Sequence, residues 1–121
     1  MAALTDLWGD LNTAELVPTP VSILKEQAAL LGKKTGNLIE ARVETSFSGD
    51  GFSHRLLLVA PALDGYTYEL LKFYHRAELY PVFAAGMQLE NEEFFKKWLG
   101  TKLSSPETHQ IITNLLSQSR S

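Results

Sequence analysis

The stretch of sequence that decides the fold is NLIEARVETSFSGDGFSHRLLLVA, residues 37–60. In its first half, apolar residues alternate with charged and polar ones, which is the period-two pattern of a strand with one buried face. At its centre, residues 48–51 read SGDG and have the composition of a tight turn, because glycine adopts positive φ at little cost. The second half is another apolar run. The whole stretch therefore predicts a β-hairpin.

The register of this hairpin follows from its turn. A loop of two residues and a loop of four residues both place Phe47 opposite Phe52. Counting back from this pair sets Glu44 opposite Arg55 on the polar face, where opposite charges stabilise cross-strand pairing. The same register sets aliphatic residues opposite one another on the core-facing side.

Two more strands are expected after the hairpin. The Asp64-Gly65 turn signal precedes an aromatic and aliphatic run at 66–74, which predicts the third strand. A short fourth strand is expected at about 79–87, where Pro81 indicates an edge position. In both strands, apolar residues occupy positions on both faces. Each face is therefore expected to be covered, either by helices on both sides of the sheet or by another chain.

Helices are predicted ahead of the strands. Thr19 and Pro20 combine a capping side chain with a proline at the first helical position, which predicts a helix over 20–31. Within the N-terminal segment 1–18, residues 2–11 have apolar side chains at i, i+3, i+4 and i+7. This spacing predicts a second, docked amphipathic helix, although a glycine within it weakens it by about 1 kcal/mol. The apolar side chains are Leu4, Leu7, Trp8 and Leu11.

Two helices are predicted after the strands. Asn91 is a capping residue ahead of two glutamates, which suit the positive end of a helix dipole. Gly100 is expected to end this helix. Ser105 and Pro106 repeat the pattern of cap and proline and open the last helix, which leads into a polar tail at 119–121.

These elements predict one α+β domain over residues 1–121. Its four-stranded antiparallel meander is preceded by one or two helices and followed by two C-terminal helices. Aliphatic, aromatic and Met residues make up 45% of the chain, which is enough for a substantial core at this length.

The composition restricts what the domain binds. The net charge is −3, with 11 basic and 14 acidic residues and no dense basic run, which argues against a nucleic-acid partner. No apolar run approaches the ~20 residues of a membrane span and no secretion signal is recognised, so a cytoplasmic location and no membrane partner are expected. The chain has no cysteine, which excludes disulfides and thiolate zinc sites, and no cofactor is expected.

The three histidines, His54, His75 and His109, are more than twenty residues apart from one another and form no metal-binding signature. No metal site is therefore predicted. His54 falls on the core-facing side of its strand, opposite Thr45. We interpret it as a partly exposed histidine that is bonded to the Thr45 hydroxyl or to water.

A tyrosine-rich stretch is the main candidate for a binding surface. Tyrosine combines an apolar body with a polar tip, and arginine can hold a carboxylate. Packing alone is the simpler explanation, because aromatic residues are common in strands. The candidate ligand- or partner-binding residues are His54, Tyr66, Tyr68, Lys72, Tyr74, His75, Arg76 and Tyr80.

Two functions remain open. No catalytic motif is recognised and no catalytic residue is assigned. The first hypothesis is therefore a small non-enzymatic binding or regulatory protein that acts through a protein–protein surface, either with a different protein or as a homodimer. The alternative is a small-molecule-binding protein or an enzyme whose pocket lies between the sheet and a covering helix. Its candidate residues are those given above without Arg76 and Tyr80.

Overall fold

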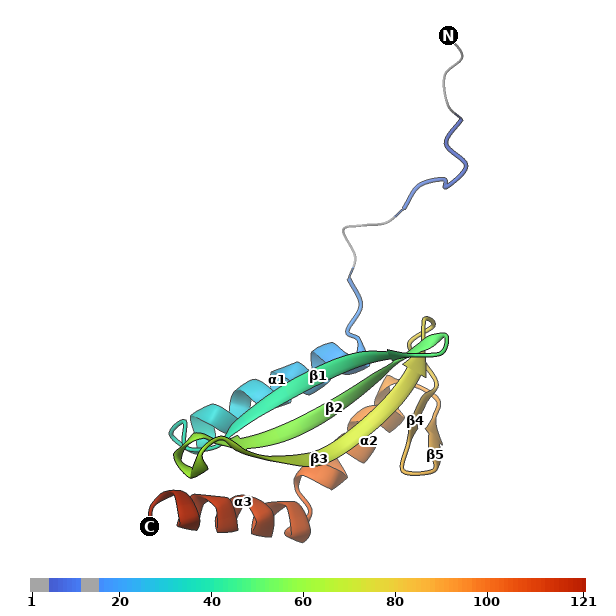
Figure 1. Cartoon of the computed structure of the whole chain (residues 1–121). Coiled ribbons are helices and arrows are strands. Elements are labelled where there is room, and N and C mark those ends of the chain that lie inside the picture. The colour runs from blue at the N-terminus through green and yellow to red at the C-terminus, as the bar shows by residue number, and fades with distance from the viewer. Residues whose placement is uncertain (1–4, 12–15) are drawn as a thin grey trace.

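The computed structural model describes residues 5–11 and 16–121. Within these ranges the chain has the predicted α+β fold, in which one helix precedes an antiparallel sheet and two helices follow it (Figure 1). The sheet has five strands in the order β1-β2-β3-β4-β5, one more than predicted. The elements are α1 Pro20–Lys34, β1 Glu40–Ser48, β2 Gly51–Ala60, the short 3-10 helix η1 Pro61–Leu63, β3 Tyr66–Arg76, β4 Val82–Ala84, β5 Met87–Leu89, α2 Glu92–Leu103 and α3 Pro106–Ser119.

The helices begin where their caps predict. At the start of α1, the Thr19 hydroxyl accepts from the backbone N–H of Ser22 at 3.0 Å, and the Ser22 hydroxyl accepts from that of Thr19 at 2.8 Å. At α2 and α3, the side chains of Asn91 and Ser105 accept from the backbone N–H groups of Phe94 and Thr108. The prediction that Gly100 ends α2 is wrong, because the helix continues to Leu103. One glycine costs a helix only about 1 kcal/mol, which packing of the neighbouring apolar side chains offsets.

The predicted hairpin register is confirmed. Phe47 lies opposite Phe52 and Glu44 lies opposite Arg55, with Gly49 at positive φ in the turn. Phe47 is nevertheless 82% exposed, although the alternation places it on the core-facing side of β1. Alternation assigns a side chain to a face of the sheet and does not say whether a helix lies over that end of the strand.

A β-bulge in β3 changes which face its apolar residues occupy. Simple alternation places them on both faces of the strand, but the bulge brings successive leucines to the same face. The pairing of β2 with β3 shifts by one residue after Leu56, so Leu70 has no partner on β2. The extra residue lets Leu70 and Leu71 both face the helices, and both are buried. Beyond the bulge, Tyr68 lies opposite the buried Leu58 and faces the same side. The charged residues of β3 therefore share the other face.

The predicted fourth strand at 79–87 is a short hairpin instead. Ala85 and Gly86 both have positive φ and turn the chain between β4 and β5. Because β5 pairs with the far side of β4, the edge position inferred from Pro81 is wrong, and β5 is the edge strand. Proline is compatible with this arrangement because it precedes β4 and removes no donor from the ladder.

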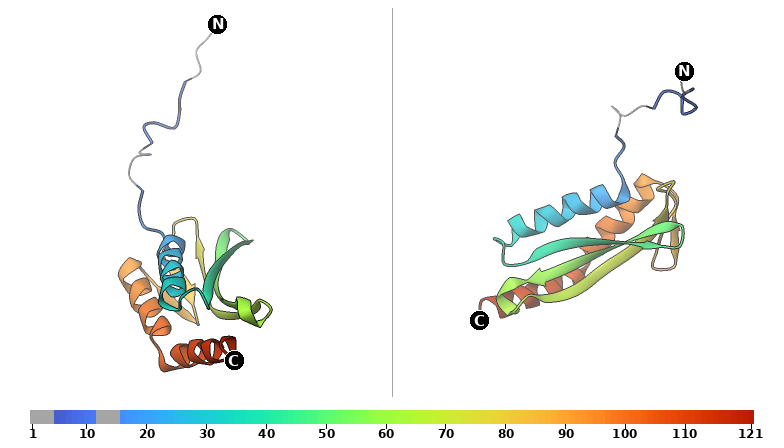
Figure 2. Two further views of the ribbon diagram at one scale, coloured as in Figure 1. Left: turned by 90° about the vertical axis from the view of Figure 1, so that its left-hand side faces the viewer. Right: turned by 45° about the horizontal axis from the view of Figure 1, so that its top comes forward.

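All three α-helices of the described ranges lie on one face of the sheet, which leaves the opposite face without a helical layer (Figure 2). The core lies between the helices and this covered face. Its most deeply buried large side chains include Phe95 from α2, Leu24 from α1, Leu58 from β2 and Val82 from β4. Helices on both sides of the sheet are therefore not found.

The N-terminal segment does not form the docked helix predicted for residues 2–11. Its described part, residues 5–11, is not helical and lies away from the folded domain (Figure 1). Gly9 has a φ of 73°, which interrupts a right-handed helix. A helix of this length is also marginal in water, because few hydrogen bonds offset the cost of nucleation. Residues 2–4 of the prediction lie outside the described ranges.

Candidate functional site

Two histidines from adjacent strands meet in the core. His54 on β2 and His75 on β3 have their Nε2 atoms 2.8 Å apart, and their side chains are only 3% and 4% exposed. Phe73 lies opposite His54 and Phe52 lies opposite His75, so the two histidines are diagonal neighbours on the core-facing side. The interpretation of His54 as partly exposed is therefore wrong.

The hydrogen bonds around this pair define one consistent arrangement of protons. The backbone carbonyl of Arg76 can only accept, so Nδ1 of His75, 2.7 Å away, carries a proton, and Nε2 accepts when this ring is neutral. Nε2 of His54 then donates to His75. Nδ1 of His54 accepts from the Thr45 hydroxyl at 2.8 Å, which confirms the predicted contact with Thr45. Both rings are neutral in this arrangement, and all four ring nitrogens have partners.

Burial keeps His54 in its neutral form. Its pKa is lowered from 6.5 to about 4, mainly by the loss of hydration on burial and in smaller part by the nearby His75 and by Lys25 on α1. The rings also pack against Phe52 and Phe73. Among residues 5–11 and 16–121, no group of three or more His, Asp or Glu side chains is placed to hold a metal ion. The pair therefore has the features of a satisfied polar element within the core.

The other sequence-derived candidates lie in different places. Tyr66 and Tyr68 are on the covered face at the η1 end of β3, and both are partly exposed. Lys72 and Tyr74 lie on the open face. Tyr80 precedes β4, and its hydroxyl is buried without a hydrogen-bond partner among the described residues. Only His54 and His75 share a buried site.

Asp50, in the turn between β1 and β2, was not among the predicted site residues. Its carboxylate accepts a hydrogen bond from the Tyr74 hydroxyl at 2.9 Å and lies 3.7 Å from the guanidinium of Arg76. The hydrogen bond to Asp50 raises the pKa of Tyr74. Gly51 permits the close approach, because a Cβ there would lie 2.5 Å from the carbonyl oxygen of His75. These contacts connect the hairpin turn to β3.

An apolar cavity of about 540 Å³ lies between α1, α3 and the sheet. None of the eight candidate residues lines it. Lys34 and His109 are among its polar lining residues, while the hydroxyls of Thr35 and Thr108 are bonded to backbone carbonyls. Its apolar lining includes Leu31, Leu56, Leu58, Leu70, Ile112 and Leu116.

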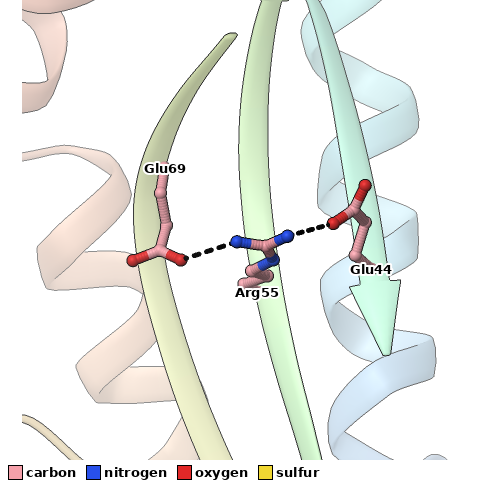
Figure 3. A network of polar contacts seen from close by, with 3 residues as sticks. All are labelled: Glu44, Arg55 and Glu69. Atoms are coloured by element: carbon pink, nitrogen blue, oxygen red, sulfur yellow. Dashed lines mark hydrogen bonds and ion pairs between the residues drawn. The ribbon is translucent and has the colours of Figure 1, made fainter. Parts of the chain in front are cut away.

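A row of alternating charges crosses the open face. Arg55 on β2 contacts Glu44 on β1 at 2.5 Å and Glu69 on β3 at 3.4 Å (Figure 3). Arg42 stands two residues before Glu44 and therefore on the same face of β1. It is exposed and makes no ion pair with a described residue. The row thus ends at β1, which has a neighbouring strand on one side only.

No family model, curated protein or solved structure matches this chain. Within the described ranges, no helix has the length and apolar character needed to cross a bilayer. The partners of the chain are therefore inferred from its own surfaces and cavity.

The N-terminal segment presents five of the six most exposed large apolar side chains among the described residues, and Phe47 is the sixth. These five side chains are between 65% and 91% exposed, and all precede α1. They are Leu7, Trp8, Leu11, Leu16 and Val17. The sequence already contained this signal as the spacing of the first three, but the spacing alone did not distinguish a docked helix from an exposed segment.

Proposed function

We propose that this chain is a small non-enzymatic binding protein that holds a protein partner through its N-terminal segment, residues 5–17. The observation that carries the proposal is the exposure of five large apolar side chains in that segment. A soluble domain normally buries such a concentration of leucine and tryptophan, or uses it for recognition.

The chemistry of the segment defines the partner surface. Leu7, Trp8 and Leu11 share one side if the segment becomes helical on binding, which suits the insertion of an amphipathic helix into an apolar groove. Tryptophan is also enriched among the residues that dominate binding energy. Asp6 and Asp10 flank these anchors, and the first basic residue of the chain is Lys25. The expected partner therefore has an apolar groove with basic residues at its rim.

The paired histidines favour this function over catalysis. Their four ring nitrogens are committed to Thr45, to each other and to the carbonyl of Arg76. A general base must reach the proton of a substrate, either directly or through one water. The buried pair offers no free nitrogen for that role.

Replacing Trp8 with alanine should weaken partner binding without unfolding the domain. Trp8 and Phe47 are each 82% exposed, so Phe47→Ala is a matched control that removes an equally exposed aromatic ring outside the segment. We expect Trp8→Ala to reduce retention of a native-lysate partner at least tenfold, because loss of an anchor residue typically costs about 2 kcal/mol or more. Quantitative pull-down with each full-length variant measures this.

The outcome that contradicts the proposal is equally specific. Equal retention of the same partner by the wild type, Trp8→Ala and Phe47→Ala would place binding on another surface. Failure of the wild type to retain any protein would contradict a protein partner. Circular dichroism of both variants should match the wild type, because neither side chain packs in the core.

The apolar cavity favours a second candidate function, the binding of a small molecule with an apolar body and an anionic group. Lys34 lines the cavity, whereas the adjacent Lys33 does not. The anionic dye anilinonaphthalene sulfonate is a suitable probe. We expect Lys34→Glu to weaken its binding about fivefold and Lys33→Glu to leave it nearly unchanged, because a partly exposed charge contact is worth up to about 1 kcal/mol. Fluorescence titration measures both, and equal effects would exclude the cavity as the binding site.

A further inference from the structure

The edge of the sheet at β1 is the strongest unassigned feature of the domain. β1 is nine residues long and, among residues 5–11 and 16–121, pairs with β2 only, so its outer side has backbone N–H and C=O groups without a strand partner there. The opposite edge, β5, has only three residues. Short edge strands resist further pairing, whereas a long one is a template for it.

We propose that β1 pairs with β1 of a second copy of this chain, antiparallel and about a two-fold axis at Val43. This inference goes beyond the proposed partner binding and uses a different surface. The pairing would join two five-stranded sheets into one continuous sheet. The interface is isologous and closes at two copies, because β1 is consumed and β5 is too short to continue the sheet.

Charge complementarity selects the second copy as the occupant. With Val43 opposite its own counterpart, Arg42 of each copy lies opposite Glu44 of the other. Two ion pairs form, related by the two-fold axis. Each extends the row in Figure 3, which then reads Glu69, Arg55, Glu44 and Arg42 of the second copy, with alternating sign. Arg42, which pairs with no described residue in the single copy, thereby gains a carboxylate.

Other registers are less favourable. An axis at Arg42 or at Glu44 places like charges opposite each other, which destabilises cross-strand pairing. An axis at Thr45 keeps a long overlap but loses both ion pairs. An axis at Ala41 leaves only residues 40–42 of β1 paired, because the strand begins at Glu40. The Val43 register alone combines a long overlap with opposite charges.

The covered face of β1 also suits this pairing. Val43 and Ala41 are partly buried and pack against the core cluster beneath α1. In the proposed register Val43 meets Val43 of the second copy, and Ala41 meets Thr45. Pairs of β-branched side chains stabilise adjacent antiparallel strands.

Complementary charge variants test the ion pairs. In Arg42→Glu, positions 42 and 44 both carry carboxylates, so each contact between them in the homodimer becomes Glu opposite Glu. In Glu44→Arg the same contact becomes Arg opposite Arg. We expect each variant alone to dissociate at least tenfold more readily than the wild type, and an equimolar mixture to re-form a dimer of opposite charges. Light scattering after size exclusion should give twice 13.5 kDa for the wild type and for the mixture.

A cysteine cross-link tests the register. The chain has no cysteine, so Val43→Cys introduces a single thiol per copy. Residues directly opposite in an antiparallel pair have Cα atoms about 4.5–5.5 Å apart, within reach of a disulfide. We expect Val43→Cys to cross-link on mild oxidation. The control Thr45→Cys should not, because the two copies of that position are roughly 14 Å apart in this register.

Three results would overturn the proposal: a monomeric wild type at every concentration up to about 1 mM, a dimer that both charge variants leave unchanged, or cross-linking at Thr45→Cys in preference to Val43→Cys. Trp8→Ala separates this proposal from the previous one. It should leave the dimer intact, because Trp8 lies outside β1.

Discussion

Replacing Leu56 with alanine is expected to lower the free energy of unfolding by about 2–5 kcal/mol. Leu56 is 2% exposed on the covered face of β2, between Val43 on β1 and Leu71 on β3. It also lines the existing cavity. Truncation would therefore enlarge a space that the surrounding helices already leave open, and the lost contacts would not be replaced by collapse of the core. Urea-induced unfolding at equilibrium measures the change.

Leu57→Ala provides the matched comparison in the same strand. Leu57 is 5% exposed, but it faces the open side between Arg42 and Glu69 and lies outside the core cluster. We expect its truncation to cost only about 1 kcal/mol, because the flexible charged side chains beside it can close over the gap and water can enter. An equal loss in both variants would mean that another layer covers the open face in solution.

The hairpin of β1 and β2 could be predicted in full because its information is local. The turn at Gly49 and Asp50 leaves one register that places Glu44 opposite Arg55 and apolar residues together on one face. Each of these conditions can be checked by counting along the chain. The helix caps at Thr19, Asn91 and Ser105 are local signals of the same kind.

The histidine pair could not be predicted because it depends on the register between β2 and β3. These strands are joined by η1 and the turn at Asp64 and Gly65, and the bulge at Leu70 shifts their pairing by one residue. Without that register, the sequence places His54 on the covered face but leaves His75 unassigned. His54 and His75 are 21 residues apart in the sequence, so no short sequence pattern predicts their contact.

The exposure of the N-terminal segment shows the same limit in another form. If the segment were helical, the spacing of Leu7, Trp8 and Leu11 would place them on one apolar face. The spacing does not predict whether another part of the protein covers that face. The positive φ at Gly9 and the position of residues 5–11 away from the domain are properties of the folded chain. Likewise, the apolar residues of 79–87 predicted one strand and did not reveal the turn at Ala85 and Gly86.

Acidification from pH 7 to pH 4 is expected to remove about 3 kcal/mol of stability through His54. Its folded-state pKa is about 4, below the 6.5 of the unfolded chain. Between these values the unfolded chain binds a proton that the folded chain does not, so stability falls as the pH falls through this window. Above pH 6.5 the contribution is fully present, and below about pH 4 the loss from this residue stops.

His54→Gln isolates this contribution from the carboxylates that also titrate in acid. The amide can still donate and accept hydrogen bonds in the core but does not titrate. The wild type should therefore lose more stability than His54→Gln between pH 7 and pH 4, in urea unfolding series at each pH. His109→Gln is the control for the loss of a histidine that lies on the surface and outside the buried pair. An NMR titration that placed the pKa of His54 near 6.5 would contradict the buried, neutral pair, since the rings of His54 and His75 would then be accessible to water.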